Sequence, residues 1–228
     1  MGMDLPSELL VLRNAILKMG AAVEQRVDQA TEALLTGDMD LAMRVRRGDD
    51  EIDQMEIDNE EECLHILALT QPVAGDLRFV LAVLRMNYEL ERIGDLSKSV
   101  AKRATDLKQL GVTELPPALI NMAYEARRMF ADAMLALVEN EASIAHSVRR
   151  ADQRVDDLQK EVFAWAQDEI PRHVEITEGA IDMLSIARKL EQIGDLSTSI
   201  AEDVIFLIEG TVIRHEKLKP SPRSKEDR

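Results

Sequence analysis

The sequence predicts an all-α protein made of two tandem antiparallel three-helix bundles. Hydrophobic residues make up 46% of the 228 residues but aromatic residues only 3%, so aliphatic side chains and 11 methionines must fill the core, which favours helices over sheets. Apolar residues recur at helical spacing in almost every long segment. The phrase ERIGDLSKSVA at 91–101 returns as EQIGDLSTSIA at 191–201. We therefore expect six long helices and an internal duplication.

The first copy is predicted to contain helices at 8–35, 38–70 and 76–110. The first of these helices follows an apolar stripe of Leu9, Leu12, Ile16, Met19, Val23, Val27, Ala30 and Leu34. The phrase TGD at 36–38 then supplies a glycine stop and an N-cap aspartate for the second helix. Pro72 and Gly75 interrupt the pattern, and Asp76 is placed to cap the third helix.

The second copy begins after GVTELPP at 111–117 and repeats the scheme. We predict helices at 117–138, 141–169 and 175–209, with a break at Pro171. The chain then divides into a first repeat at 1–112, a second repeat at 113–216 and a tail at 217–228. The tail is polar and contains two prolines, so we predict that it is disordered.

Charge and composition exclude several classes of function. The formal net charge of −15 and the pI near 4.7 argue against nucleic acid as a partner, because phosphate backbones require a basic face. A single cysteine, Cys63, is expected to be a small buried hydrophobe in a reducing compartment. The N-terminus has no basic region before an apolar run, and no run reaches about 20 residues. We expect a soluble, cytoplasmic protein that does not insert into a membrane.

Two pairs of acids occupy equivalent places in the repeated phrase. Glu91 and Asp95 in one copy, and Glu191 and Asp195 in the other, are four residues apart and lie on one helix face about 6 Å apart along the axis. Like charges at this spacing cost an isolated helix about 0.2–0.5 kcal/mol. A cation nearby could remove that cost.

The glycine between the two acids has its own cost. Gly94 and Gly194 stand inside predicted helices, where glycine is disfavoured by about 1 kcal/mol relative to alanine. The close approach of a neighbouring helix or of a ligand could compensate. We take helix packing as the first explanation.

The preceding helix of each copy carries a second pair of acids, Asp49 with Asp53 and Asp152 with Asp156. In an antiparallel hairpin, residues equally far from the turn lie at the same height, and these acids mirror the later pairs about the predicted turns. Each copy can thus bring four carboxylates to one level. Glu24 and Asp28 are candidates for a fifth and sixth in the first copy, and Glu125 is a weaker counterpart in the second.

These pairs have two interpretations. If the acids point into water, they are ordinary hydrophilic surface. If they converge, their repulsion requires protonation or a metal ion, and carboxylate oxygens favour ions such as Mg²⁺, Ca²⁺, Mn²⁺ and iron.

The doubled phrase resembles the PhoU family of phosphate-transport accessory and regulatory proteins. The resemblance depends on the tandem ERIGD and EQIGD phrases, on QPVAGDLR at 71–78 and on the order of six helices, and it covers nearly the whole chain. It implies two similar three-helix bundles, often in a homodimer. It also implies metal ions or small iron or zinc clusters at Glu91, Asp95, Glu191 and Asp195, with Asp49, Asp53, Asp152 and Asp156 as matching acids on the preceding helices.

The resemblance further implies a regulatory function without substrate turnover. Proteins of this family dampen phosphate uptake through a phosphate ABC transporter and restrain the phosphate-starvation sensor kinase. The expected partners are therefore the ATPase subunit of that transporter and a sensor histidine kinase.

The alternative interpretation is a carboxylate-bridged metal enzyme of the ferritin-like or oxidase kind. Glu62 and His65 have the E-x-x-H spacing of such bundles, but that chemistry needs two such motifs and the sequence contains only one. A structural role for His65 is the simpler interpretation.

Overall fold

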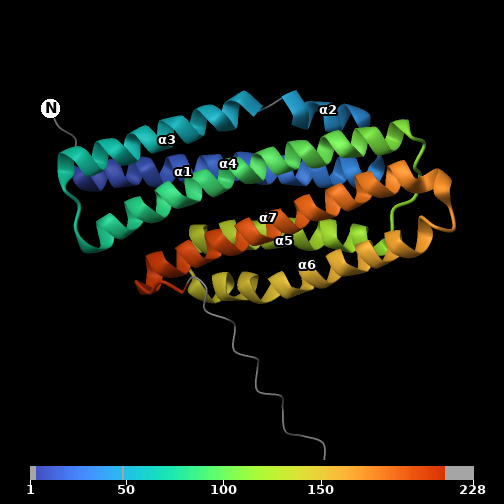
Figure 1. Ribbon diagram of the computed structural model, residues 1–228. Helices are drawn as coiled ribbons and strands as arrows, with labels where there is room; N and C mark the ends of the chain where they lie inside the picture. The colour runs from blue at the N-terminus through green and yellow to red at the C-terminus, as the bar shows by residue number, and fades with distance from the viewer. Residues whose placement is uncertain (1–3, 48, 214–228) are drawn as a thin grey trace, which may run out of the picture.

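The structure is a computed structural model that describes residues 4–47 and 49–213, apart from the side chains of residues 49 and 50. Two bundles of long antiparallel helices lie side by side (Figure 1). Within the described residues there is no strand. The predicted fold class is thus confirmed, whereas the predicted tail at 217–228 lies outside the described residues.

The first bundle contains α1 (Leu5–Thr36), α2 (Met39–Arg47), α3 (Asp49–Thr70) and α4 (Ala74–Gln109). The second contains α5 (Pro117–Glu139), α6 (Ala142–Glu169) and α7 (Thr177–Glu209), with a short 3-10 helix, η1 (Val174–Ile176), ahead of α7. Five of the six predicted helices end within a few residues of these bounds. The bundles are joined by the segment at 110–116.

The predicted second helix at 38–70 corresponds to α2 and α3, which are described on either side of residue 48, itself outside the described residues. The equivalent part of the second bundle, α6, is continuous. The sequence places Gly48 where the second copy has Ala151, in RRGDD against RRADQ.

The predicted apolar stripe of α1 forms the centre of the first bundle. Leu12, Ile16, Met19 and Val23 are fully buried, and the stripe continues through Val27, Ala30 and Leu34. The core of the second bundle is built around Phe130, Met129 and Leu158. Each bundle therefore buries aliphatic and methionine side chains along its whole length, as the composition indicated.

Local signals at helix ends are partly confirmed. Gly37 adopts a left-handed conformation (φ 67°) at the end of α1, and the Asp38 carboxylate accepts a hydrogen bond from the Leu41 amide (2.9 Å). The expected cap at Asp76 is wrong: the N-cap of α4 is Val73, and Asp76 lies within the first turn. An acid in that position still interacts favourably with the helix dipole.

The two bundles meet where α4 packs along α7 and α1 packs along α5. Arg85 of α4 pairs with the buried Asp203 of α7 (3.4 Å), and Arg103 pairs with Asp182 (2.8 Å). On the other side, Gly20 of α1 lies directly against the Met134 side chain of α5. In the described residues, no helix is long and apolar enough to cross a membrane.

Candidate functional site: two acidic clusters

The structure brings together the four acids predicted in the second copy. Asp152 and Asp156 come from α6, and Glu191 and Asp195 come from the facing part of α7. We call these four residues the second acidic cluster. Each of the three acids whose pKa is raised is acted on by at least two other members of the cluster. These four acids, which were predicted to lie at the same height, therefore also lie on the facing sides of α6 and α7.

Burial and repulsion make the second acidic cluster unfavourable when every member is ionised. Burial, followed by Asp195 and Asp156, raises the pKa of Asp152 to about 6. Burial and the neighbouring carboxylates also raise the pKa of Glu191 and of Asp195. Thr198 Oγ1 donates a hydrogen bond to Asp152 (3.4 Å) and so opposes the shift. Protonation of a member of the cluster therefore relieves this repulsion.

The first copy assembles the equivalent acids of α3 and α4. Asp53, Glu91 and Asp95 form the first acidic cluster, with Glu56 beside them. Burial raises the pKa of Glu91, and Asp95, Glu56 and Asp53 raise it further, whereas Arg92 lowers it. The backbone of Asp49 begins α3, but its side chain lies outside the described part of the chain.

A buried arginine distinguishes the first acidic cluster, and the sequence analysis missed it. Arg26 of α1 is only 7% exposed, and its pKa is lowered by burial and raised by Asp53, Asp95 and Glu51. A Cβ placed on Gly94 would lie 3.8 Å from Arg26 Nη1, so the guanidinium reaches the centre of the repeated phrase. The first cluster thus already contains a positive charge supplied by the chain.

Carboxylate oxygens are suitable ligands for a divalent metal ion, but those of the clusters do not converge on one point. Among the described side chains, no group of three or more His, Cys, Asp or Glu residues is arranged to hold a metal ion. The oxygen donors of the second acidic cluster are nevertheless those that hard divalent cations prefer. Rotamer changes would have to bring these oxygens closer before they could share an ion.

Helix packing does not require the two repeated glycines. A Cβ on Gly94 would lie 3.4 Å from Ile52 Cδ1, and one on Gly194 would lie 3.6 Å from Val155 Cγ1. Both are ordinary van der Waals distances. The structure therefore accommodates alanine at either position, contrary to the packing explanation.

The other acids considered from the sequence do not join the clusters. Asp28 pairs with Arg127 of α5 (2.5 Å), and Glu24 lies beside this pair. Glu125 pairs with Arg128 (2.7 Å). Because α1 packs against α5, Glu24 and Asp28 lie at the junction between the bundles, beside Arg127.

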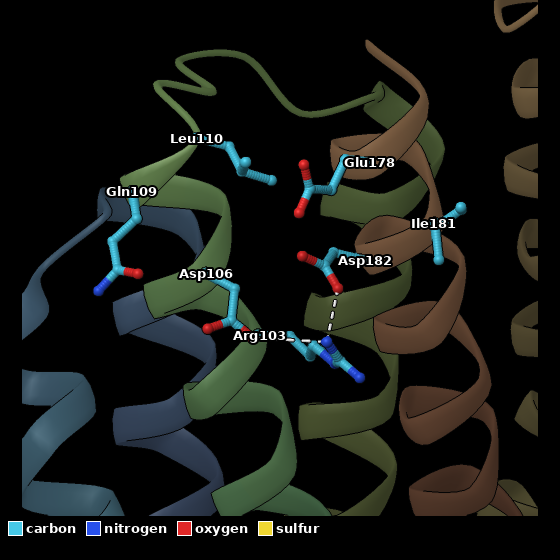
Figure 2. Close-up of a pocket in the computed structure, with 7 residues that line it drawn as sticks. All are labelled: Arg103, Asp106, Gln109, Leu110, Glu178, Ile181 and Asp182. Carbon is cyan, nitrogen blue, oxygen red and sulfur yellow. Dashed lines mark hydrogen bonds and ion pairs between the residues drawn. The ribbon is translucent and has the colours of Figure 1, made fainter.

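A polar pocket at one end of the α4–α7 junction was not predicted. Figure 2 shows the Arg103 guanidinium, which donates to Asp182 (2.8 Å) and to Asp106 (3.4 Å), with Glu178 farther along the pocket beyond Asp182. Burial raises the pKa of Asp182, and Arg103 opposes that shift. The pocket carries three acids and one base, so it favours a cationic group. These residues are brought together by the pairing of the two repeats, which leaves no local pattern in the sequence.

The fold and these sites define a class of protein: a duplicated all-α bundle with one acidic cluster in each repeat. The PhoU domain matches this chain twice, at residues 16–104 and 119–204. The chain therefore belongs to the PhoU family.

Similar proteins cover nearly the full chain. A Pseudomonas putida protein named phosphate-specific transport system accessory protein PhoU homolog is 36% identical over 220 residues, covering 93% of this chain and 84% of the relative. A protein of the same name from Aquifex aeolicus is 32% identical, covering 95% and 98%. These names describe accessory proteins of phosphate transport and not enzymes.

Solved structures agree with the sequence relatives. The crystal structure of PhoU from Pseudomonas aeruginosa matches with a TM-score of 0.87 at 35% identity, covering 91% of this chain and 100% of that one. The phosphate transport system regulatory protein PhoU from Streptococcus pneumoniae matches with a TM-score of 0.79 at 28% identity, covering 92% and 99%.

The enzyme alternative gains no support from the structure. His65 is exposed on α3, away from the buried face of the bundle. Cys63 is buried, and burial raises its thiol pKa to about 12, so it is not a reactive nucleophile. The family and its named relatives instead indicate an accessory role.

Proposed function

We propose that this protein is a cytoplasmic regulator of phosphate homeostasis that acts by binding other proteins. The observation that carries the proposal is the family match in both repeats, together with relatives named for the phosphate-specific transport system over more than nine-tenths of this chain. Its action is negative: it reduces phosphate uptake and phosphate-starvation signalling when phosphate is plentiful.

The proposed partners are the ATPase subunit of a phosphate ABC transporter and a phosphate sensor histidine kinase. The net charge of −15 favours basic partner surfaces, and the acidic pocket at the α4–α7 junction offers a place for a cationic side chain. We also propose a homodimer. Leu10 of α1 and Leu135 and Val138 of α5 are exposed apolar side chains on two helices that pack together, which is consistent with a protein interface.

A divalent metal ion is proposed as a structural partner of the second acidic cluster. In the second cluster, Asp152, Asp156, Glu191 and Asp195 would hold it. When bound, the ion supplies positive charge that offsets the carboxylate repulsion. The four side chains then tie α6 to α7 and fix the bundle surface that meets a partner.

The regulatory proposal is tested in cells that lack the protein. We expect phosphate uptake and starvation-gene expression to rise in phosphate-rich medium, and both to fall again when the chain is restored. Purified protein should retain the transporter ATPase subunit or the kinase in a pull-down, but not an unrelated transporter ATPase. Unchanged uptake and signalling, with neither partner retained, would contradict the proposal. Sustained oxygen-dependent turnover by purified protein would favour the enzyme alternative.

A further inference from the structure

The two repeats can be compared residue by residue around the repeated glycine. A Cβ on Gly94 would contact Ile52 and Arg26, whereas one on Gly194 would contact Val155 and Met129. Ile52 and Val155 are separated by the same number of positions as Arg26 and Met129. Arg26 and Met129 are therefore structural equivalents, one in α1 and the other in α5.

Positive residues of the first repeat are neutral in the second at three positions near the acidic phrase. Arg26 corresponds to Met129, Arg92 to Gln192, and Lys98 to Thr198. Arg92 acts on Glu91 and lowers its pKa, whereas Thr198 is a neutral donor to Asp152. The acids of the phrase thus occur in both repeats, whereas these three positive residues occur only in the first.

Arg26 lies in the interior beside the acidic phrase of the first repeat. Its side chain is 7% exposed and Met129 is 1% exposed, so both occupy the interior between the first helix of the repeat and the acidic phrase. A guanidinium remains charged at every physiological pH and cannot diffuse away. Its burial is offset by Asp53, Asp95 and Glu51. A divalent cation approaching the same carboxylates would be repelled by it.

We infer that Arg26 is the built-in counter-cation of the first acidic cluster, so that a divalent metal ion binds only at the second. The part of this inference that concerns metal rests on the proposed function. The part that concerns Arg26 is independent of metal. The first repeat would then supply the counter-cation of its own acids, whereas the acids of the second repeat would take theirs from solution.

The metal part is tested by titrating purified full-length protein with Mn²⁺ and measuring bound ions per chain. We expect Glu191→Gln to remove the binding seen in the wild type and Glu91→Gln, its matched control, to leave it unchanged. Arg26→Met, which installs the residue of the second repeat, should add binding that Glu91→Gln then removes. Equal loss in Glu91→Gln and Glu191→Gln in the wild-type background would overturn the inference.

The Arg26 part is tested by thermal unfolding in EDTA. At pH 7, Arg26→Met should lower the melting temperature by about 3 °C or more, and adding Asp53→Asn should recover much of that loss. Met129→Leu is the matched control and should change little. Loss without recovery, or no loss, would overturn the role of Arg26. If neither the wild type nor Arg26→Met binds Mn²⁺, the metal proposal fails, and the confinement of metal to the second cluster fails with it.

Discussion

The two bundles share a backbone plan but differ in what they bury. The first contains Arg26 and a hydrogen-bonded pair in which Asn59 Nδ2 donates to Asn87 Oδ1 (2.9 Å). At the equivalent positions the second bundle has Met129, Val162 and Ala187. The first repeat therefore buries a cation and an amide pair at positions where the second repeat has apolar side chains, and the acidic phrase of the second repeat has no arginine at the position of Arg26. Duplication preserved the acidic phrase while the surrounding charges diverged.

The largest expected effect concerns the apolar core of the second repeat. Phe130 is fully buried and occupies the position that Val27 has in the first repeat. We expect Phe130→Ala to lower the free energy of unfolding by about 3–5 kcal/mol, because it leaves a cavity. Val27→Ala, the matched change, should cost less. Urea denaturation measures both, and a larger loss at Val27 would contradict the difference in core packing.

The next effect concerns the buried asparagines of the first repeat. Asn87→Ala leaves the Asn59 amide with only the weak acceptor Met19 Sδ (3.5 Å), so we expect a loss of about 1–3 kcal/mol. The double change Asn59→Val with Asn87→Ala copies the second repeat and should recover much of that loss, because neither polar group is then buried unpaired. A double-mutant cycle measures the coupling. Additive losses would show that the pair acts independently.

A smaller effect is the pH dependence contributed by Asp152. Its pKa in the folded protein is about 6, above the ordinary 3.8, so the folded state holds the proton more tightly than the unfolded state. This carboxyl therefore destabilises the fold as pH rises from about 4 to 6. We expect Asp152→Asn, without metal, to remove that slope and to raise stability at pH 7 by about 1 kcal/mol, reduced by solvent screening. An unchanged slope in pH-resolved unfolding would contradict this account.

The smallest effect concerns the repeated glycines. Because a Cβ fits at both sites, we expect Gly94→Ala and Gly194→Ala each to raise the free energy of unfolding by up to about 1 kcal/mol through better helix propensity. The gain should be larger at Gly194, where the nearest atom is farther away. Thermal unfolding in EDTA separates this effect from metal binding. A loss at both sites would restore the packing explanation.

Helical periodicity and turn residues were enough to predict the fold. The stripe from Leu12 to Leu34 and the break at Pro72 have local causes, so they can be read from neighbouring residues.

The acids were easier to predict than their counter-charges. Reflection about a turn gives the height of Asp156 relative to Glu191 because both helices belong to one hairpin. Arg26 belongs to a third helix, and its face depends on how α1 rotates against α4 and α5. The same rotation turned Glu24 and Asp28 toward α5. An alignment of the two repeats places Arg26 opposite Met129, and that difference was the sequence signal that could have identified this arginine.

The most direct test of this comparison is the free energy of unfolding of two matched variants in EDTA at pH 7. Asp53→Asn removes a partner of the buried Arg26, so we expect a loss of about 1 kcal/mol. Asp156→Asn removes one of several mutually repelling carboxylates, so we expect a gain of about 0.5–1 kcal/mol. Opposite signs are the predicted result. Changes of the same sign in both variants would contradict the claim that only the first acidic cluster carries its own cation.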